Sequence, residues 1–150
     1  MSIEDNKEFI IEEGMVMEYV GNGKEVEIPA GVTDIFFEAF YGVCAITSVT
    51  IPGTILDITP FVFERCSSLK KVSLKEGVKT IGVNSFNDCE KLEIINLPKS
   101  IECIKIGAFS NCPLLKEIRF NGTKKEWDTV TKEEKWDENT GEYAIICCSN

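Results

Sequence analysis

A 23-residue repeat constrains this chain more than any other feature of its sequence. Phe40, Phe63, Phe86 and Phe109 recur at this one constant spacing. Further apolar columns keep the same spacing: Ile46, Leu69, Leu92, Leu115; Val49, Val72, Ile95, Ile118; Ile28, Ile51, Leu74, Leu97, Phe120; Val32, Ile55, Val78, Ile101; and Ile35, Ile58, Ile81, Ile104. A unit this short cannot bury its own apolar row, but stacked units share one continuous core. The sequence therefore predicts a repeat solenoid.

Alternation of apolar and polar residues predicts one short strand in each unit. Val72 and Leu74 alternate with polar neighbours, and residues 47–51 and 116–120 follow the same pattern. Strands of successive coils would form a parallel sheet on one face, and parallel crossovers are right-handed almost without exception. Residues 85–89 and their equivalents favour helical or 3₁₀ turns on the other face. The expected fold is thus mainly β, a right-handed solenoid.

The two ends of the chain depart from the repeat and predict capping units, because an open solenoid exposes apolar core and strand edge at each terminus. We expect a single domain with an N-terminal cap at residues 1–24, repeats at 25–120 and a C-terminal cap at 121–150. The Gly-Asn-Gly sequence at 21–23 is typical of a hairpin-type turn.

Two aromatic residues predict the structure of the C-terminal cap. Trp127 lies one repeat length after Ile104 and is expected to cover the last coil from a short helix over 124–131 that also carries Val130. Thr123 and Glu126 form the pattern of a capping box at the start of that helix, so residues 121–123 favour a turn over a glycosylation site. Tyr143, one repeat length after Phe120, predicts a last strand over 143–147.

The seven cysteines cannot all pair within the chain, and four of them follow the phenylalanine column. Cys44, Cys66, Cys89 and Cys112 would lie in a line, which neither surrounds a tetrahedral zinc ion nor aims thiols at one another. We therefore expect small buried residues there. Cys103, Cys147 and Cys148 lie outside this column, and Cys147 with Cys148 is a weak candidate for redox activity because no basic neighbour favours the thiolate.

Composition excludes several classes of function. The chain has no histidine, and its 25 acidic residues spread over exposed positions without an isolated pair, so we expect neither an enzyme nor a metal or other cofactor. The net charge of −9 argues against nucleic acid and anionic membranes as partners. No apolar run reaches the length of a membrane span. The polar residues 1–8 show no signal peptide.

The outward positions of the predicted strands are the candidate binding site. They vary from coil to coil while the core columns do not, and adjacent strands present such positions as a regular grid. The candidate partner-binding strand face comprises Ser48, Thr50, Lys71, Ser73, Lys75, Ile94, Asn96, Glu117 and Arg119. A purely solvated surface is the equal alternative.

One further apolar column, outside the core columns above, allows two interpretations. It consists of Phe37, Pro60, Val83 and Ile106, with Phe36 and Phe61 beside it. An exposed ridge of this kind would mark a contact surface. The interpretation that we prefer is closure of the core on the turn side.

The pattern of one whole unit resembles the BspA-like leucine-rich repeats, the treponemal class. The residues that carry the resemblance are Val78, Ile81, Gly82, Ser85, Phe86, Cys89, Leu92, Ile95, Leu97 and Pro98. It covers residues 25 to 120, and both flanks are similar to the family's end units. The resemblance implies a bacterial cell-surface or secreted protein that adheres to host matrix or other cells. We therefore expect an adhesin-like module that binds protein and is monomeric; the alternative is a cytoplasmic scaffold or self-associating repeat protein.

Overall fold

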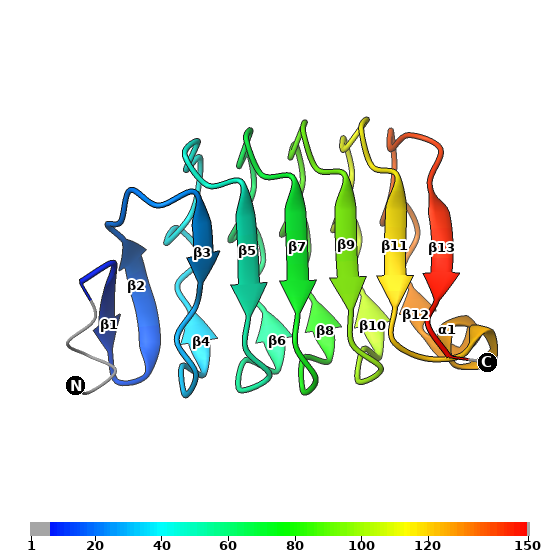
Figure 1. Cartoon of the computed structure of the whole chain (residues 1–150), viewed down its shortest axis with the longest axis horizontal. Coiled ribbons are helices and arrows are strands. Elements are labelled where there is room, and N and C mark those ends of the chain that lie inside the picture. The colour runs from blue at the N-terminus through cyan, green and yellow to red at the C-terminus, as the bar shows by residue number, and fades with distance from the viewer. Residues whose placement is uncertain (1–6, 150) are drawn as a thin grey trace.

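A six-stranded parallel sheet runs along one side of the molecule (Figure 1). The computed structural model describes residues 7–149, and residues 1–6 of the expected N-terminal cap lie outside that range. The strands of this sheet are β3 (Glu25–Glu27), β5 (Ser48–Ile51), β7 (Lys71–Leu74), β9 (Ile94–Leu97), β11 (Glu117–Phe120) and β13 (Ala144–Cys147). From β3 to β11 each residue pairs with the one 23 positions on, as in Val49 with Val72. The predicted solenoid and its parallel sheet are confirmed.

A second parallel sheet of very short strands, which the sequence pattern did not predict, lies behind the first. Its strands are β6 (Asp57–Ile58), β8 (Thr80–Ile81), β10 (Cys103–Ile104) and β12 (Thr131–Lys132). Each strand has only two residues and buries a single one in β6, β8 and β10. A strand of that length cannot display alternation, so the isoleucine column signalled burial but not a strand.

The turns that follow these short strands contain no helix, so the prediction of helical or 3₁₀ turns is wrong. Ser85 N–H donates within its own turn to the Gly82 carbonyl at 3.2 Å, but Phe86 N–H donates to Ala108 of the next coil at 2.9 Å. This alternation continues through the turn. A helix would use all these amides within one coil, whereas here half of them join neighbouring coils. Phe86 and Cys89 still point into the core, as expected.

The phenylalanine column forms a continuous ring stack through the centre of the solenoid. The ring centroids of Phe40, Phe63, Phe86 and Phe109 are 4.8, 5.2 and 5.3 Å apart in succession. All four rings are fully buried. Tyr19 stacks on the first ring at 5.4 Å, and Trp136 meets the last one edge-on at 6.3 Å. The aromatic column is therefore closed at both ends by other aromatic rings.

The N-terminal cap is an antiparallel hairpin of β1 (Phe9–Glu12) and β2 (Met15–Tyr19). Its turn is Glu13-Gly14, where both residues have positive φ angles of 49° and 80°, as the tightest hairpin turns require. β2 then pairs with β4 (Asp34–Ile35) in a parallel arrangement. Residues 21–23 connect strands of two different sheets, so the hairpin turn predicted there is wrong.

The C-terminal cap is built around helix α1 (Lys124–Thr129), which begins with the predicted capping box of Thr123 and Glu126. Trp127 is 4% exposed and covers the last coil, with its ring 5.4 Å from that of Phe120. The helix is shorter than predicted, because Val130 is its C-cap in an extended conformation, although that side chain is buried. The role of the tryptophan is confirmed.

The 23-residue register fails beyond Phe120, because the cap helix adds residues to the last coil. β12 pairs Lys132, not Trp127, with Ile104. β13 likewise pairs Cys147 with Phe120, so Tyr143 precedes the strand. The last strand exists as predicted, but both column assignments are wrong.

Removing one ring from the centre of the stack tests the importance of this column. We expect Phe86→Ala to lower the free energy of unfolding by about 3–5 kcal/mol, since it leaves a cavity between two packed rings. Urea unfolding followed by circular dichroism measures the loss. The matched control is Phe37→Ala, whose ring is 46% exposed; a loss of stability as large as that of Phe86→Ala would contradict the assignment.

Candidate functional site

The outer face of the six-stranded sheet presents two parallel rows of side chains, because successive residues of a strand point to opposite sides. Inward residues such as Val72 and Ile95 are fully buried, whereas the outward ones are half-buried or exposed. The first row is Glu25, Ser48, Lys71, Ile94, Glu117 and Ala144; the second is Glu27, Thr50, Ser73, Asn96, Arg119 and Ile146. Together these residues are called the strand face.

The structure brings eight of the nine predicted site residues together on the strand face. The exception is Lys75, which follows the end of β7 and is exposed beside the face. The prediction missed both ends of the rows. Glu25 and Glu27 could have been found one repeat length before Ser48 and Thr50, but the altered register of the last coil hid Ala144 and Ile146.

Several side chains of the strand face bind one another. Asn96 Nδ2 donates to Ser73 Oγ across two strands at 3.1 Å. Arg119 Nε donates to Glu117 Oε2 at 2.6 Å along one strand. Within residues 7–149, the Lys71 ammonium has no such partner and is exposed on β7, in the row next to that of Ser73. The centre of the face thus combines oriented polar groups with one free positive charge.

A groove of about 400 Å³ lies at the carboxyl ends of β7, β9 and β11. It extends the second row of the strand face, since Ser73, Asn96 and Arg119 line it together with Lys75. The groove therefore connects Lys75 to the predicted site. Its two cations, Lys75 and Arg119, and its three amide or hydroxyl side chains can bind carboxylate and carbonyl oxygens.

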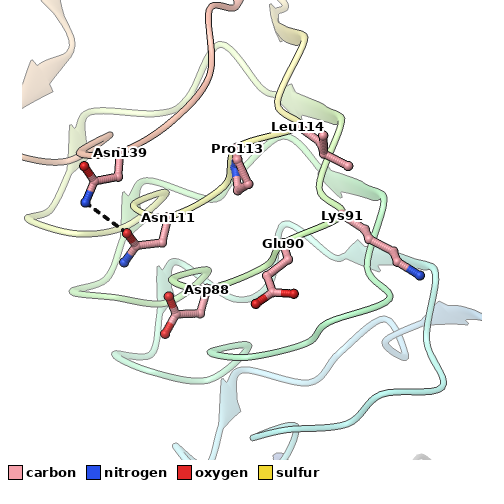
Figure 2. A pocket seen from close by; sticks show the side chains of 7 residues that line it. All are labelled: Asp88, Glu90, Lys91, Asn111, Pro113, Leu114 and Asn139. Atoms are coloured by element: carbon pink, nitrogen blue, oxygen red, sulfur yellow. Dashed lines mark hydrogen bonds between the residues drawn. The ribbon is translucent and has the colours of Figure 1, made fainter.

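Another hollow, of about 530 Å³, lies beside a ladder of asparagine side chains (Figure 2). Asn139 Nδ2 donates to Asn111 Oδ1 at 3.1 Å, and Asn111 Nδ2 donates to Asn87 Oδ1 at 2.9 Å. Asn87 Nδ2 in turn donates to Glu64 at 2.9 Å. These amides bind each other from coil to coil, so their role is to join coils. No cluster of three side chains suited to a metal ion occurs among residues 7–149.

The apolar column of the turns is exposed, so the preferred interpretation, closure of the core, is wrong. Phe37, Pro60 and Ile106 are exposed and Val83 is half-buried, while Phe36 packs against the core. A residue with positive φ follows three of these positions, namely Phe61, Asn84 and Gly107. A sharp turn thus follows the side chain at these three positions, whereas Phe37 is exposed without one.

Three cysteines form the buried column that the sequence predicts. The thiols of Cys66, Cys89 and Cys112 each donate to the carbonyl of the phenylalanine one coil earlier, with Sγ···O distances of 3.3 Å. Burial raises the pKa of Cys66 and of Cys112 to about 12, and raises that of Cys89 well above its ordinary value. These thiols are therefore unreactive donors in the core.

Cys44 does not belong to that column, which corrects the expectation. Val43 occupies the position: its N–H donates to the Phe40 carbonyl just as Cys66 N–H donates to that of Phe63. Val43 packs against the core and Cys44 is exposed. The extra residue between Phe40 and Cys44 in the sequence already indicated this shift.

The adjacent cysteines near the C-terminus lie in different environments. Cys147 is half-buried at the end of β13 and packs against the core, whereas Cys148 is exposed and lines the groove. Neighbours in an extended chain point to opposite sides. This arrangement disfavours a redox pair. Cys103 is half-buried in β10. The hydrogen bond that Lys105 donates to Glu133 is the largest cause that raises the pKa of Lys105, and Cys103 contributes to the same shift.

Thiol reactivity tests this division of the cysteines. At pH 8 we expect Cys44 and Cys148 to be alkylated as fast as model thiols, and Cys66, Cys89 and Cys112 only as fast as the chain unfolds, because they are buried and protonated. Mass spectrometry of the alkylated peptides gives the rate for each residue. Rapid labelling of Cys89 in the folded protein would contradict the buried column.

Alkaline pH should destabilise the fold through the same column. In the unfolded chain these thiols ionise near pH 9, but in the fold Cys66 and Cys112 keep their protons to about 12. The folded state therefore binds more protons in that interval, and the free energy of unfolding falls as pH rises, by up to about 1.4 kcal/mol per pH unit for each thiol. Urea unfolding of the wild type and of Cys112→Ala between these two pH values measures the effect. The free energy of unfolding of the variant should fall less steeply with pH, and equal slopes would refute the buried thiol as the cause.

Comparison with known proteins places this architecture. A family model described as the BspA type leucine rich repeat region, in six copies, matches residues 14–131. No curated protein matches the chain. Among solved structures, a leucine rich cell surface protein from Faecalibacterium prausnitzii A2-165 is 25% identical with a TM-score of 0.56, over 88% of this chain and 44% of that one. A leucine-rich repeat protein from Bacteroides ovatus ATCC 8483 is 29% identical with a TM-score of 0.64, over 89% and 36%.

A third structure is a leucine-rich repeat protein from Eubacterium ventriosum ATCC 27560, with a TM-score of 0.66 and 19% identity. The match covers 92% of this chain and 51% of that one, and it shows the shared fold. The chain thus spans about half or less of the length of these three proteins. The one helix among the described residues is too short to cross a membrane. The chain belongs to the BspA type leucine-rich repeat family.

Proposed function

We propose that the chain is a non-catalytic module that binds a partner protein through the strand face. The observation that carries the proposal is the grid of outward side chains on β3 to β13, whose identity changes from coil to coil above a core that repeats. The ladder holds the backbone of the paired strands, so the backbone needs no ordering when a partner binds.

The chemistry of the strand face suits a protein surface. Its β3 end is acidic, its centre carries Lys71, the Ser73–Asn96 hydrogen bond and the Arg119–Glu117 ion pair, and its β13 end is apolar. Ile146 is 39% exposed at that apolar end. A mixture of polar, charged and apolar groups in one patch is typical of protein interfaces. The overall net charge of −9 disfavours nucleic acid.

An adhesin-like role at the cell surface is our first candidate. It is supported by the Faecalibacterium prausnitzii relative, which is described as a cell surface protein. An intracellular scaffold is the second candidate, supported by the buried thiols of Cys66, Cys89 and Cys112, which are placed as hydrogen-bond donors and not as disulfide partners. Thiol titration of denatured protein from its native source separates the two: seven free thiols favour a reducing compartment.

A triple substitution at the centre of the strand face tests the binding role. We expect Lys71→Ala, Ser73→Ala and Arg119→Ala together to weaken binding to purified extracellular-matrix proteins by at least about tenfold, since hot spots lie near the centre of an interface. Surface plasmon resonance against a panel of such proteins gives the affinities. The free energy of unfolding should change by no more than about 1 kcal/mol.

The matched control replaces the same residue classes away from the strand face, as Lys79→Ala, Ser67→Ala and Lys135→Ala. It should bind as the wild type does. Undiminished binding by the strand-face variant would refute the assignment of this face. Binding of the wild type to no protein of the panel would count against the adhesin-like role.

A further inference from the structure

An aromatic cluster with two carboxylates lies exposed on the turns that follow β4 and β6. Phe37, Tyr41 and Phe61 are 46%, 49% and 40% exposed, respectively. With Glu38 and Glu64 they line a hollow of about 200 Å³. These five residues are called the aromatic patch. Exposed aromatic side chains gathered at one place often mark a contact surface, and the strand face does not include them.

A backbone hydrogen bond joins the two turns of the aromatic patch. Gly42 N–H donates to the Glu64 carbonyl at 3.2 Å, which joins the turn carrying Tyr41 to the turn carrying Phe61. Glu64 Oε1 also accepts from Asn87 Nδ2 at 2.9 Å, so its carboxylate is oriented by the neighbouring coil. The hollow between the rings is therefore formed before any ligand arrives.

Phe61 has an unfavourable backbone conformation for an aromatic residue. Its φ angle is +65°, in the left-handed region that bulky residues rarely adopt. The equivalent positions of the next three coils have φ angles of +51°, +71° and +57° and carry Asn84, Gly107 and Lys135. Asparagine and glycine tolerate this conformation, whereas lysine adopts it less readily. Because Phe61 remains 40% exposed, burial compensates for the strain only in part. Strain retained at an exposed aromatic residue points to a role outside folding.

The charge of the aromatic patch identifies its ligand. A cation is attracted both by the negative face of an aromatic ring and by a carboxylate. An apolar ligand would instead have to remove water from Glu38 and Glu64 without replacing it. A second copy of this chain, with its own net charge of −9, would meet electrostatic repulsion.

We propose that the aromatic patch binds an arginine or lysine side chain from a partner protein. The cationic group lies over the rings of Phe37, Tyr41 and Phe61, and the carboxylates of Glu38 and Glu64 pair with it at the rim. This surface is separate from the strand face, so the failure of one assignment leaves the other standing.

Short peptides test the proposal on the intact chain. The probe is acetyl-Gly-Gly-Arg-Gly-Gly-amide, compared with peptides carrying Lys, Leu or Glu in place of Arg. Each is titrated against the isotope-labelled protein to the order of 10 mM, where affinities weaker than 1 mM are still measurable from amide shifts. We expect the Arg and Lys peptides to shift the amides of residues 37–41 and 61–64, and the Leu and Glu peptides to bind at least about tenfold more weakly.

Two variants remove one component each from the aromatic patch. Phe61→Asn and Glu38→Gln should each weaken binding of the Arg peptide by about fivefold or more. Phe61→Asn should leave the melting temperature unchanged or higher, because asparagine suits the left-handed conformation; this separates a binding role from a structural one. The matched controls are Leu56→Ser, at a side chain that is 49% exposed, and Asp57→Asn in the adjacent strand, and both should bind as the wild type does.

Three outcomes would overturn the proposal. The first is the absence of shifts in the aromatic patch with the Arg peptide. The second is equal binding of the Leu peptide, which would indicate an apolar ligand. The third is a dimer of the free chain in sedimentation that Phe61→Asn abolishes, because the occupant would then be a second copy.

Discussion

The spacing between coils is the constraint on which the rest of the structure depends. Ladder hydrogen bonds hold paired strands about 4.8 Å apart, and the aromatic rings of Phe40, Phe63, Phe86 and Phe109 follow at 4.8 to 5.3 Å. Flat rings stack at this distance, so the same residue type can recur in every coil. Each inward position is thereby assigned to the core. A chain built in this way has only its outward positions available for recognition.

The regular part of the fold could be predicted from the sequence because the constant spacing between coils requires the same type of residue at each inward position. Each inward column, such as that of Val49, Val72, Ile95 and Ile118, is apolar because its members meet the same neighbours in every coil. Prediction failed where an insertion changes the register, as when the residues of α1 move Cys147 opposite Phe120. It also failed where hydrogen bonds decide the structure: amides such as Phe86 N–H bind the next coil, and no residue type encodes that choice.

The candidate site was predictable to the same extent, for the same reason. Alternation along a strand identifies Lys71 and Ser73 as outward, and the 23-residue register extends this to every regular coil. The register does not say which outward residues remain free. Asn96 binds Ser73 and Arg119 binds Glu117, and these contacts depend on side-chain geometry between and along strands. The apolar column of Phe37, Pro60, Val83 and Ile106 shows the opposite failure, because its composition suggested core whereas the structure leaves it exposed or half-buried.

Departures from the repeat are more informative about function than the repeat itself. A position that every coil fills with a residue suited to its backbone reports only on folding. The column of Phe61, Asn84, Gly107 and Lys135 adopts the left-handed conformation, and two of its four members, Asn84 and Gly107, suit it. Phenylalanine there adds strain while it remains 40% exposed, so its burial offsets that strain only in part. The position becomes conspicuous only when backbone angle and exposure are considered together, and neither can be obtained from residue type. In a solenoid, therefore, a mismatch between residue and local geometry is the physical criterion that separates recognition from architecture.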